Sequence, residues 1–431
     1  MKRLISLAIA PLLILSICAT PALAATPKAG TKCPTFGQSV IASGKKFTCL
    51  MLGSKQVWNK GVTEKTSTNT SPKSSNAAAN LPLPITLPVP QNGAITFTNA
   101  VANFASIPKT SWQRVQDAIA ANSEVSIPTV IHIGPNTKAS SNAISTALGR
   151  INKLFAGFRH VSRYNAIVYN AQDQQWAQTD ALELFMSQNI KGYSIRPDSI
   201  KNLVQAGCEI NGTEVVNCGG GMAFDFRDGG SDAGGAYYGV QSDGDYWSDS
   251  TKNVGPMSQV NHEAMHNYQS QQFFFTPLGK GQNISADLMH AATPWWFSEG
   301  QANAIGVSTF LENFSDYSQV RNDLVTRSPG SRGTIPTFTI KGMKSFLNDP
   351  QVASPENNNW LLAYSVGFAA VEALVAIGGP QSTLAIYTLA AKGEDFQTAF
   401  KHVYGISWDE GSTILAEVLA AEYASLPMST R

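Results

Sequence analysis

Two histidines four residues apart, with a glutamate directly after the first, constrain the fold of this chain more than any other feature. They form the run His262-Glu263-Ala264-Met265-His266. Positions i and i+4 of a helix lie one above the other on the same face. A helix here therefore brings both imidazoles to one ion and places Glu263 beside the water on that ion. The run predicts a metal-bearing helix and metal-assisted hydrolysis; the alternative is a turn of surface helix that carries two histidines and no metal.

A second segment supplies a candidate third ligand. Thr293 and Pro294 are typical of the N-cap and first residue of a new helix, which places Glu299 in its second turn. Two histidines, one carboxylate and a water form an open catalytic zinc site, whereas a structural site is closed by four protein ligands. A three-histidine site would need a third histidine six residues after His266, with a glycine in between. It is excluded, because the two positions hold Gln269 and Gln272. The alternative for Glu299 is a solvated residue that the helix dipole favours near a helix start.

At these two segments the chain resembles the gluzincin zinc metallopeptidases, the thermolysin and aminopeptidase type, whose second helix carries Trp-x-x-Glu-Gly-x-Ala. The resemblance implies that His262, His266 and Glu299 bind zinc and that Glu263 is the general base and proton shuttle. Glu299 follows His266 by 33 positions, which is farther than the family usually shows and implies an inserted loop around residues 271–292.

Three further features are candidates for a role at such a site. Gluzincins often stabilise the oxyanion with a Tyr or His on a helix after the third ligand. Tyr364 matches that position, although a tyrosine that only packs its helix is the alternative. His290 is an alternative ligand or donor, but a loop histidine without a partner is more often neither. An acidic segment interleaved with glycines could bind calcium as a second cofactor. It lacks the residue order of an EF-hand, so a solvated loop fits it better. Its acidic residues are Asp225, Asp228, Asp232, Asp243, Asp245 and Asp249.

The first residues predict export. Lys2 and Arg3, an apolar run and then Ala22-Leu23-Ala24 are typical of a signal peptide over residues 1–24, cleaved before Ala25; an uncleaved anchor is the alternative. We expect no transmembrane span after cleavage, because the best remaining candidate, residues 365–378, is too short and contains a glutamate. The expected localisation is secreted or associated with the cell envelope.

Four cysteines remain in the expected mature chain, and an even number in an exported protein suggests two disulfides. The local pairs Cys33 with Cys49 and Cys208 with Cys218 close the smallest loops, although the sequence does not prove the connectivity. Zinc binding by these cysteines is the competing interpretation, but none has Cys-x-x-Cys spacing.

Residues 25–62 predict a small basic β module, which we call the head. It has strand-like runs at 38–42, 47–51 and 55–58, and residues 25–60 hold six lysines and no acidic residue. Subtracting these six and the two basic residues of the leader from 31 leaves 23 basic against 30 acidic residues in the rest of the chain. The head resembles short Cys-paired modules of exported actinobacterial proteins, which implies no known activity. Its lysines could hold cell-envelope polyanions or anionic lipid headgroups; simple solubility is the alternative.

The rest of the chain predicts an α+β, zincin-like architecture. A Pro/Ser/Thr-rich linker over residues 63–92 precedes an α/β lobe over 93–255. The lobe has strand patterns at 127–133, 166–169, 221–226 and 236–240. It also has helix patterns at 141–159 and 173–187 and a hairpin at 209–214. Residues 256–431 then form a helical zinc-binding lobe, with helices at 361–377, 381–391, 395–404 and 409–426. A mixed sheet lobe followed by a helical lobe, with the metal helix between them, is the zincin arrangement.

These observations predict a secreted zinc metallopeptidase that acts on a peptide or protein substrate, with a cell-wall peptide cross-link as a variant of the same chemistry. The alternative is a non-catalytic cell-envelope protein that keeps the zincin fold for binding. Nucleic acid is not supported as a partner, because the only basic cluster lacks interleaved stacking aromatics. A phosphate-binding glycine loop is also absent, since Gly219-Gly220-Gly221 has no Lys-Ser/Thr after it.

Overall fold

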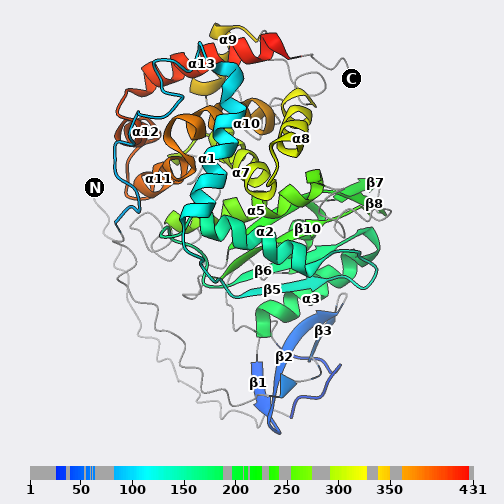
Figure 1. Ribbon diagram of the computed structural model, residues 1–431. Helices are drawn as coiled ribbons and strands as arrows, with labels where there is room; N and C mark the ends of the chain where they lie inside the picture. Colours follow the sequence, from blue (N-terminus) through cyan, green and yellow to red (C-terminus); the bar gives the residue numbers. More distant parts are fainter. Residues whose placement is uncertain are drawn as a thin grey trace, which may run out of the picture. The chain divides into compact units, whose positions relative to one another are not determined.

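The computed structural model describes residues 26–34, 39–52, 55–58, 60, 62–63, 82–187, 197–206, 208–211, 214–225, 233–241, 254–273, 292–327, 338–349 and 362–426 (Figure 1). The chain divides into two compact units, Met1–Asn69 and Thr70–Arg431. The expected leader, much of the expected linker, His290 and the acidic segment after Asp225 lie outside the described residues.

The head is a small antiparallel sheet around one disulfide. The strand β2 (Lys45–Leu52) pairs with β1 (Ser39–Ala42), β3 (Lys55–Trp58) and β4 (Val62–Thr63). Cys33 is bonded to Cys49, and both cysteines are buried together with Trp58. A unit of this size buries little apolar surface, so a covalent link between its two halves supplements the core that its described side chains form.

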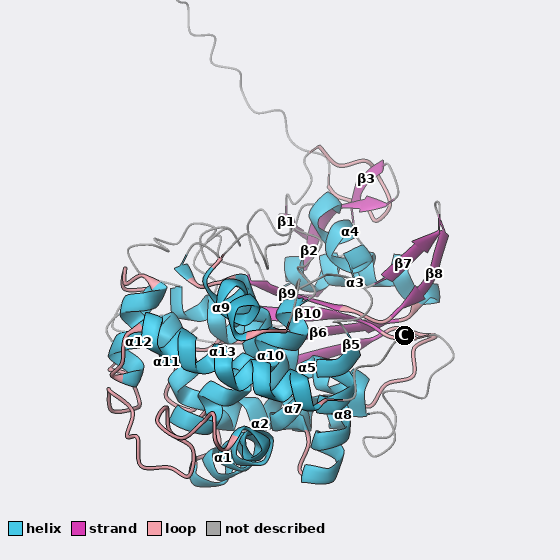
Figure 2. Cartoon of the chain, turned by 90° about the horizontal axis from the view of Figure 1, so that it is seen from above, coloured by secondary structure: helices cyan, strands magenta, loops and turns pink. Residues whose placement is uncertain are grey.

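A mixed four-stranded sheet organises the first part of the second unit. Its order is β5-β6-β10-β9, with β5 (Thr129–Ile133), β6 (Tyr164–Tyr169) and β10 (Gly234–Gly239) parallel and β9 (Gly221–Asp225) antiparallel at one edge. Helices α2 (Ser141–Leu154) and α5 (Val254–Phe273) contact it on one side, and α3 (Gln174–Ser187) and α4 (Pro197–Ala206) lie on the other (Figures 1 and 2). Both faces of the sheet are covered, which explains why β6 and β10 are buried along their whole length.

The second disulfide joins Cys208 to Cys218, which face each other across the hairpin of β7 (Cys208–Asn211) and β8 (Glu214–Cys218). Both local cysteine pairs expected from the sequence are therefore confirmed. Two disulfides fit an oxidising compartment.

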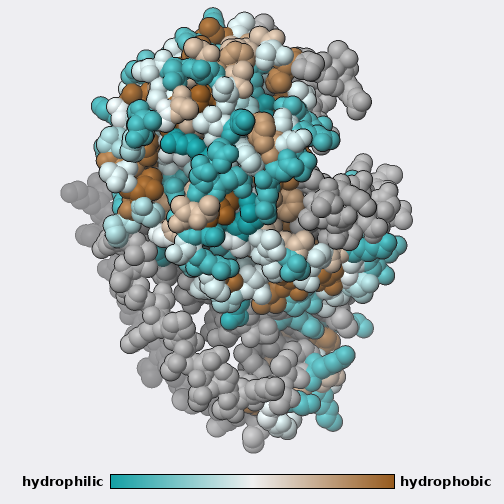
Figure 3. All heavy atoms as spheres, viewed as in Figure 1, coloured by the Kyte–Doolittle hydropathy of each residue, from teal (hydrophilic) through white to brown (hydrophobic). Residues whose placement is uncertain are grey.

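The remaining helices form an α-helical lobe around one buried helix. Helix α10 is buried over nearly its whole length, and α7 packs along it. The elements of this lobe are α1 (Ile107–Ala121), α7 (Trp295–Phe310), α8 (Phe314–Arg327), α9 (Ile340–Asn348), α10 (Leu362–Gly378), α11 (Pro380–Ala390), α12 (Phe396–Tyr404) and α13 (Trp408–Ser425). On the face seen in Figure 3, hydrophilic residues are interspersed with smaller apolar groups, as expected where helices turn their apolar sides to a shared core.

The architecture agrees with the expected mixture of a sheet and a helical lobe, and several details differ from the sequence patterns. Helices α1 and α4 were not expected, and α2 ends at Leu154 rather than near residue 159. Residues 83–89, which we assigned to the linker, pack on the core of the second unit, where Val89 is buried and its N–H donates to the Val403 carbonyl.

No single helix in the described part of the chain is long and apolar enough to cross a membrane. Helices α10 and α11 pass that test only as a pair, which is bent by 104° at the junction.

Candidate metal centre

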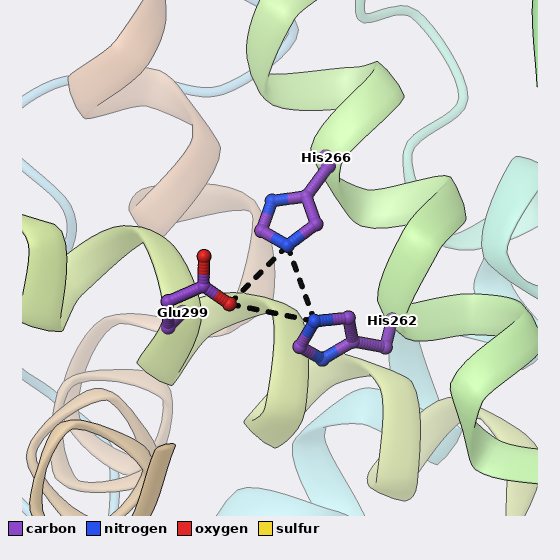
Figure 4. Close-up of side chains that lie close together, drawn as sticks. All are labelled: His262, His266 and Glu299. Atoms are coloured by element: carbon purple, nitrogen blue, oxygen red, sulfur yellow. Dashed lines mark hydrogen bonds and ion pairs between the residues drawn. The ribbon is translucent and has the colours of Figure 1, made fainter. Parts of the chain in front are cut away.

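Two helices bring three potential metal ligands together. Helix α5 carries His262 and His266 one turn apart, and α7 carries Glu299, whose carboxylate faces both imidazoles (Figure 4). The Nε2 atoms of the histidines are 3.1 Å apart, and Glu299 Oε2 lies 3.5 Å from His262 Nε2 and 3.4 Å from His266 Nε2. Among the described residues, this is the one cluster of His, Cys, Asp or Glu side chains with spacing suited to a metal ion.

The spacing of the three donor atoms fits zinc. Ligands about 2.0–2.1 Å from a tetrahedral ion lie roughly 3.3–3.4 Å from one another, close to the observed separations of 3.1, 3.4 and 3.5 Å. Glu299 is 4% exposed, and while both imidazoles are neutral its Oε2 has no hydrogen-bond donor within the described structure. A buried carboxylate oxygen without a donor is costly unless a cation neutralises it. The donor set and its geometry therefore suit a divalent cation.

The outer nitrogen of each histidine is held by an amide oxygen. His266 Nδ1 lies 2.8 Å from Gln269 Oε1, and His262 Nδ1 lies 2.8 Å from Asn303 Oδ1. An amide oxygen only accepts, so in the neutral form each imidazole carries its proton on Nδ1, and each Nε2 then has a lone pair that faces Glu299. This is the tautomer that a metal ligand needs.

The orientation of the Gln269 amide is fixed by a chain of buried hydrogen bonds. Its Nε2 donates to Gln301 Oε1 at 2.9 Å, and Gln301 Nε2 donates to Thr383 Oγ1 at 2.7 Å. The Thr383 hydroxyl donates in turn to the Pro380 carbonyl, so it accepts from Gln301. Since every step has one direction, the oxygen of Gln269 has to face His266.

The Asn303 amide is oriented by a single contact. Its Nδ2 donates to the backbone carbonyl of Tyr364 at 2.8 Å, and a carbonyl cannot donate. The oxygen of Asn303 therefore points to His262. Asn303 follows Glu299 by one helical turn, so the residue that orients a histidine and the residue that offers the third donor share one helix face.

Glycines allow the helices that carry the site to approach each other closely. A Cβ at Gly306 on α7 would lie 2.9 Å from the backbone nitrogen of His262 on α5. On the other side of α7, Gly300 lies directly against the backbone of Gly367 on α10. Trp296 fixes the start of α7, because its buried ring stacks on Trp408 and its Nε1 donates to a carbonyl. This packing determines where Glu299 lies.

Helix α7 begins one residue later than the sequence suggested. Pro294 is the N-cap with extended backbone, ψ 145°, and Trp295 is the first helical residue. The N–H groups of Phe297 and Ser298 donate to the Pro294 carbonyl, so the proline itself provides the first acceptor of the helix. Glu299 still lies in the second turn.

Glu263 lies against the edge strand β9. A Cβ at Gly221 would be 2.5 Å from its Oε1, and the backbone N–H of Ala223 donates to the carboxylate. Burial raises the pKa of Glu263; the charges of His262 and His266 and this hydrogen bond oppose that rise, and Glu299 adds to it. A raised pKa favours proton uptake, which is the property that a general base near neutral pH requires.

Tyr364 lies beside the three candidate metal ligands. Its ring is stacked on that of His262 with centroids 6.0 Å apart, and its hydroxyl is hydrogen-bonded to Glu299. Burial, and then the charges of Glu299 and Glu263, raise the pKa of Tyr364 well above its ordinary value, so the hydroxyl keeps its proton. It is therefore a hydrogen-bond donor at this site.

The three facing atoms also perturb one another electrostatically. Burial would raise the pKa of Glu299, but the neighbouring His266 and His262 hold it well below its usual range. For His266, burial lowers the pKa, yet the charge of Glu299 and the hydrogen bond with it raise that pKa to about 9. Three electron-rich atoms at this spacing can share a cation, and a proton and a metal ion would compete for that position.

Sequence reasoning named the facing residues but not the amides that hold them. Gln269 entered it only as a position that lacks a histidine. Its spacing of three residues from His266 on one helix was the available signal, and for Asn303 the signal was one turn after Glu299. The calcium hypothesis gains no described ligand set: the side chain of Asp225 and the acidic residues after it lie outside what the structure describes, as does His290.

Comparisons of the chain with models of protein families, with curated proteins and with solved structures give no significant match.

Proposed function

We propose that this chain is an exported, zinc-dependent metallopeptidase with a zincin-like fold. The observation that carries the proposal is the triangle of His262 Nε2, His266 Nε2 and Glu299 Oε2, together with the amide oxygens that fix both imidazoles as metal-binding tautomers. The Cys33–Cys49 and Cys208–Cys218 disulfides support export through an oxidising compartment, and the expected leader over residues 1–24 supports the same route.

The residues around the triangle have the chemistry that peptide hydrolysis needs. His262, His266 and Glu299 would hold zinc, which supplies a Lewis acid that lowers the pKa of a water toward about 7. Glu263 would take the proton of the attacking water and deliver it to the leaving amine. Tyr364 keeps its hydroxyl proton and would donate a hydrogen bond to the oxyanion that forms at the scissile carbonyl.

Two measurements on the mature chain test this proposal. The first is zinc content by elemental analysis after dialysis against a weak chelator, where we expect about one equivalent, lost in His262→Ala. The second is cleavage of a fluorogenic peptide library, where we expect Glu263→Gln to retain zinc and lose activity. His402→Ala and Glu124→Gln are matched controls, because both side chains are exposed and lie outside the cluster.

The outcomes separate the competing functions. Absence of zinc from the wild-type chain would overturn the metal site and the peptidase together. Stoichiometric zinc without cleavage of any library member would favour the non-catalytic binding protein. Equal cleavage by wild type and Glu263→Gln would remove Glu263 from the mechanism.

A further inference from the structure

We propose that the head binds a phosphate-rich anionic polymer through one face of its sheet. The sequence gives the charge: residues 25–60 contain six lysines, and no acidic residue occurs between positions 25 and 63. In the rest of the chain, leader excluded, 30 acidic residues outnumber 23 basic ones, so a polyanion is repelled there and attracted by the head.

Strand register places three of the lysines on the same face. Lys32 is bridged to Val57, and Lys55 lies two residues before Val57, so both share its face. On β1 and β2, Lys46 is the cross-strand partner of Ile41. Along β2 and β3, these positions alternate with those of the buried residues Cys49 and Trp58.

The opposite face of the head holds its disulfide core. Cys49 and Trp58 are cross-strand partners and are buried, and Val40 and Phe47 pair beside them and pack against that core. The face that carries the three lysine positions is therefore the one turned away from the core. We call it the lysine face and define it by Lys32, Lys46 and Lys55.

The exposure of the side chains fits a charged binding surface. Lys32 and Lys55 are exposed, as are Lys28, Lys45 and Lys60 around them. With no carboxylate in the head, every one of these charges lacks an internal counter-ion within the module. Release of condensed counter-ions from a polyanion is then the driving force for association.

A soluble polymer fits this face better than a lipid surface. Binding to a membrane surface strengthens with the apolar area that enters the headgroup region as well as with charge. Among the head residues whose side chains the structure describes, Ile41, at 63% exposure, is the one large hydrophobic side chain that is strongly exposed. The lysine face extends over three neighbouring chain segments, so a polymer that crosses them meets one positive charge on each.

The test uses the full mature chain and long-chain inorganic polyphosphate as the probe. We expect measurable binding whose affinity falls as salt rises. The triple variant Lys32→Gln, Lys46→Gln, Lys55→Gln should bind about tenfold or more weakly and lower the log–log salt slope by roughly 2. The control variant Lys201→Gln, Lys341→Gln, Lys392→Gln removes the same charge from exposed positions of the second unit and should bind like wild type.

Each outcome decides the proposal. Equal loss in the two triple variants, or no loss in the head variant, would show that binding follows net charge and overturn it. No binding of wild type to polyphosphate would also overturn it, and so would stronger binding to vesicles that contain anionic lipid at equal phosphate. An unchanged circular dichroism spectrum and an intact Cys33–Cys49 bond in the head variant exclude unfolding as the cause of a loss. The result is independent of any peptidase activity.

Discussion

The hydrogen bond between Asn303 and His262 offers a quantitative test of the metal centre. Asn303→Leu keeps a similar volume and removes the oxygen that accepts from Nδ1 at 2.8 Å. Without that acceptor the imidazole loses its tautomeric preference and part of its orientation, so zinc binding must supply the free energy of restoring both.

The expected loss of zinc affinity is about 10- to 100-fold, which corresponds to roughly 1.4–2.7 kcal/mol. A neutral hydrogen bond contributes about 0.5–1.5 kcal/mol of this, and the remainder is the free energy of orienting the ring. Asn303 is only half-buried, so global unfolding is not expected. Asn303→Asp keeps the acceptor for Nδ1 but turns its second oxygen toward the Tyr364 carbonyl, which cannot donate, so it should bind zinc more tightly than Asn303→Leu.

Competition with a zinc-chelating dye at constant pH gives the dissociation constants. Asn348→Leu is the matched control, because that asparagine is also helical, and its exposed amide donates to a backbone carbonyl away from the site. Wild-type affinity in Asn303→Leu, or an equal loss in the Asp and Leu variants, would refute the reasoning that the amide oxygen sets the tautomer.

Three more predictions follow from neighbouring contacts. Gly221→Ala should displace Glu263, the proposed general base, and reduce peptide cleavage at least about tenfold with zinc retained, whereas Gly219→Ala, which has open space around it, should be neutral in the same kinetic assay. Tyr364→Phe should lower kcat by about 10²-fold or more with little change in KM, because a donor to the oxyanion acts in the transition state; a change confined to KM would contradict that role. His132 Nδ1 donates a hydrogen bond to Asp180 Oδ2, 2.6 Å away, and this bond raises the pKa of His132 despite partial burial, so the pair stabilises the folded state fully below the unfolded pKa and loses that contribution as pH rises through the folded pKa. Urea unfolding should show that Asp180→Asn is more destabilising at pH 5.5 than at pH 9; the reverse order would show that the pair acts in some other way.

Local signals explain how much of the fold could be predicted. Helix α12 follows Asp395, whose side chain accepts from the Thr398 N–H, and it ends at Gly405 in the left-handed conformation. Both are sequence-readable caps, and the predicted range of 395–404 differs from the structure by one residue. The strand at Lys55–Trp58 was likewise predicted with the observed bounds, because turn residues precede it.

Tertiary packing explains what could not be predicted. Residues 83–89 look like a linker by composition, yet Leu83, Ile85 and Leu87 pack against a core built from distant segments. The approach of α7 to α5 depends on Gly306, and a glycine inside a helix pattern gives no sign of the partner it accommodates. The amide chain that begins at Gln269 ends on α11, so its members acquire a shared role only after folding.

The most direct test of the central claim is a crystal structure of the mature chain grown with zinc, with anomalous diffraction recorded at the zinc edge. We predict one ion within about 2.0–2.2 Å of His262 Nε2, His266 Nε2 and a Glu299 oxygen, with a water as the remaining ligand. An ion bound elsewhere, or one closed by a fourth protein ligand at this cluster, would contradict the account.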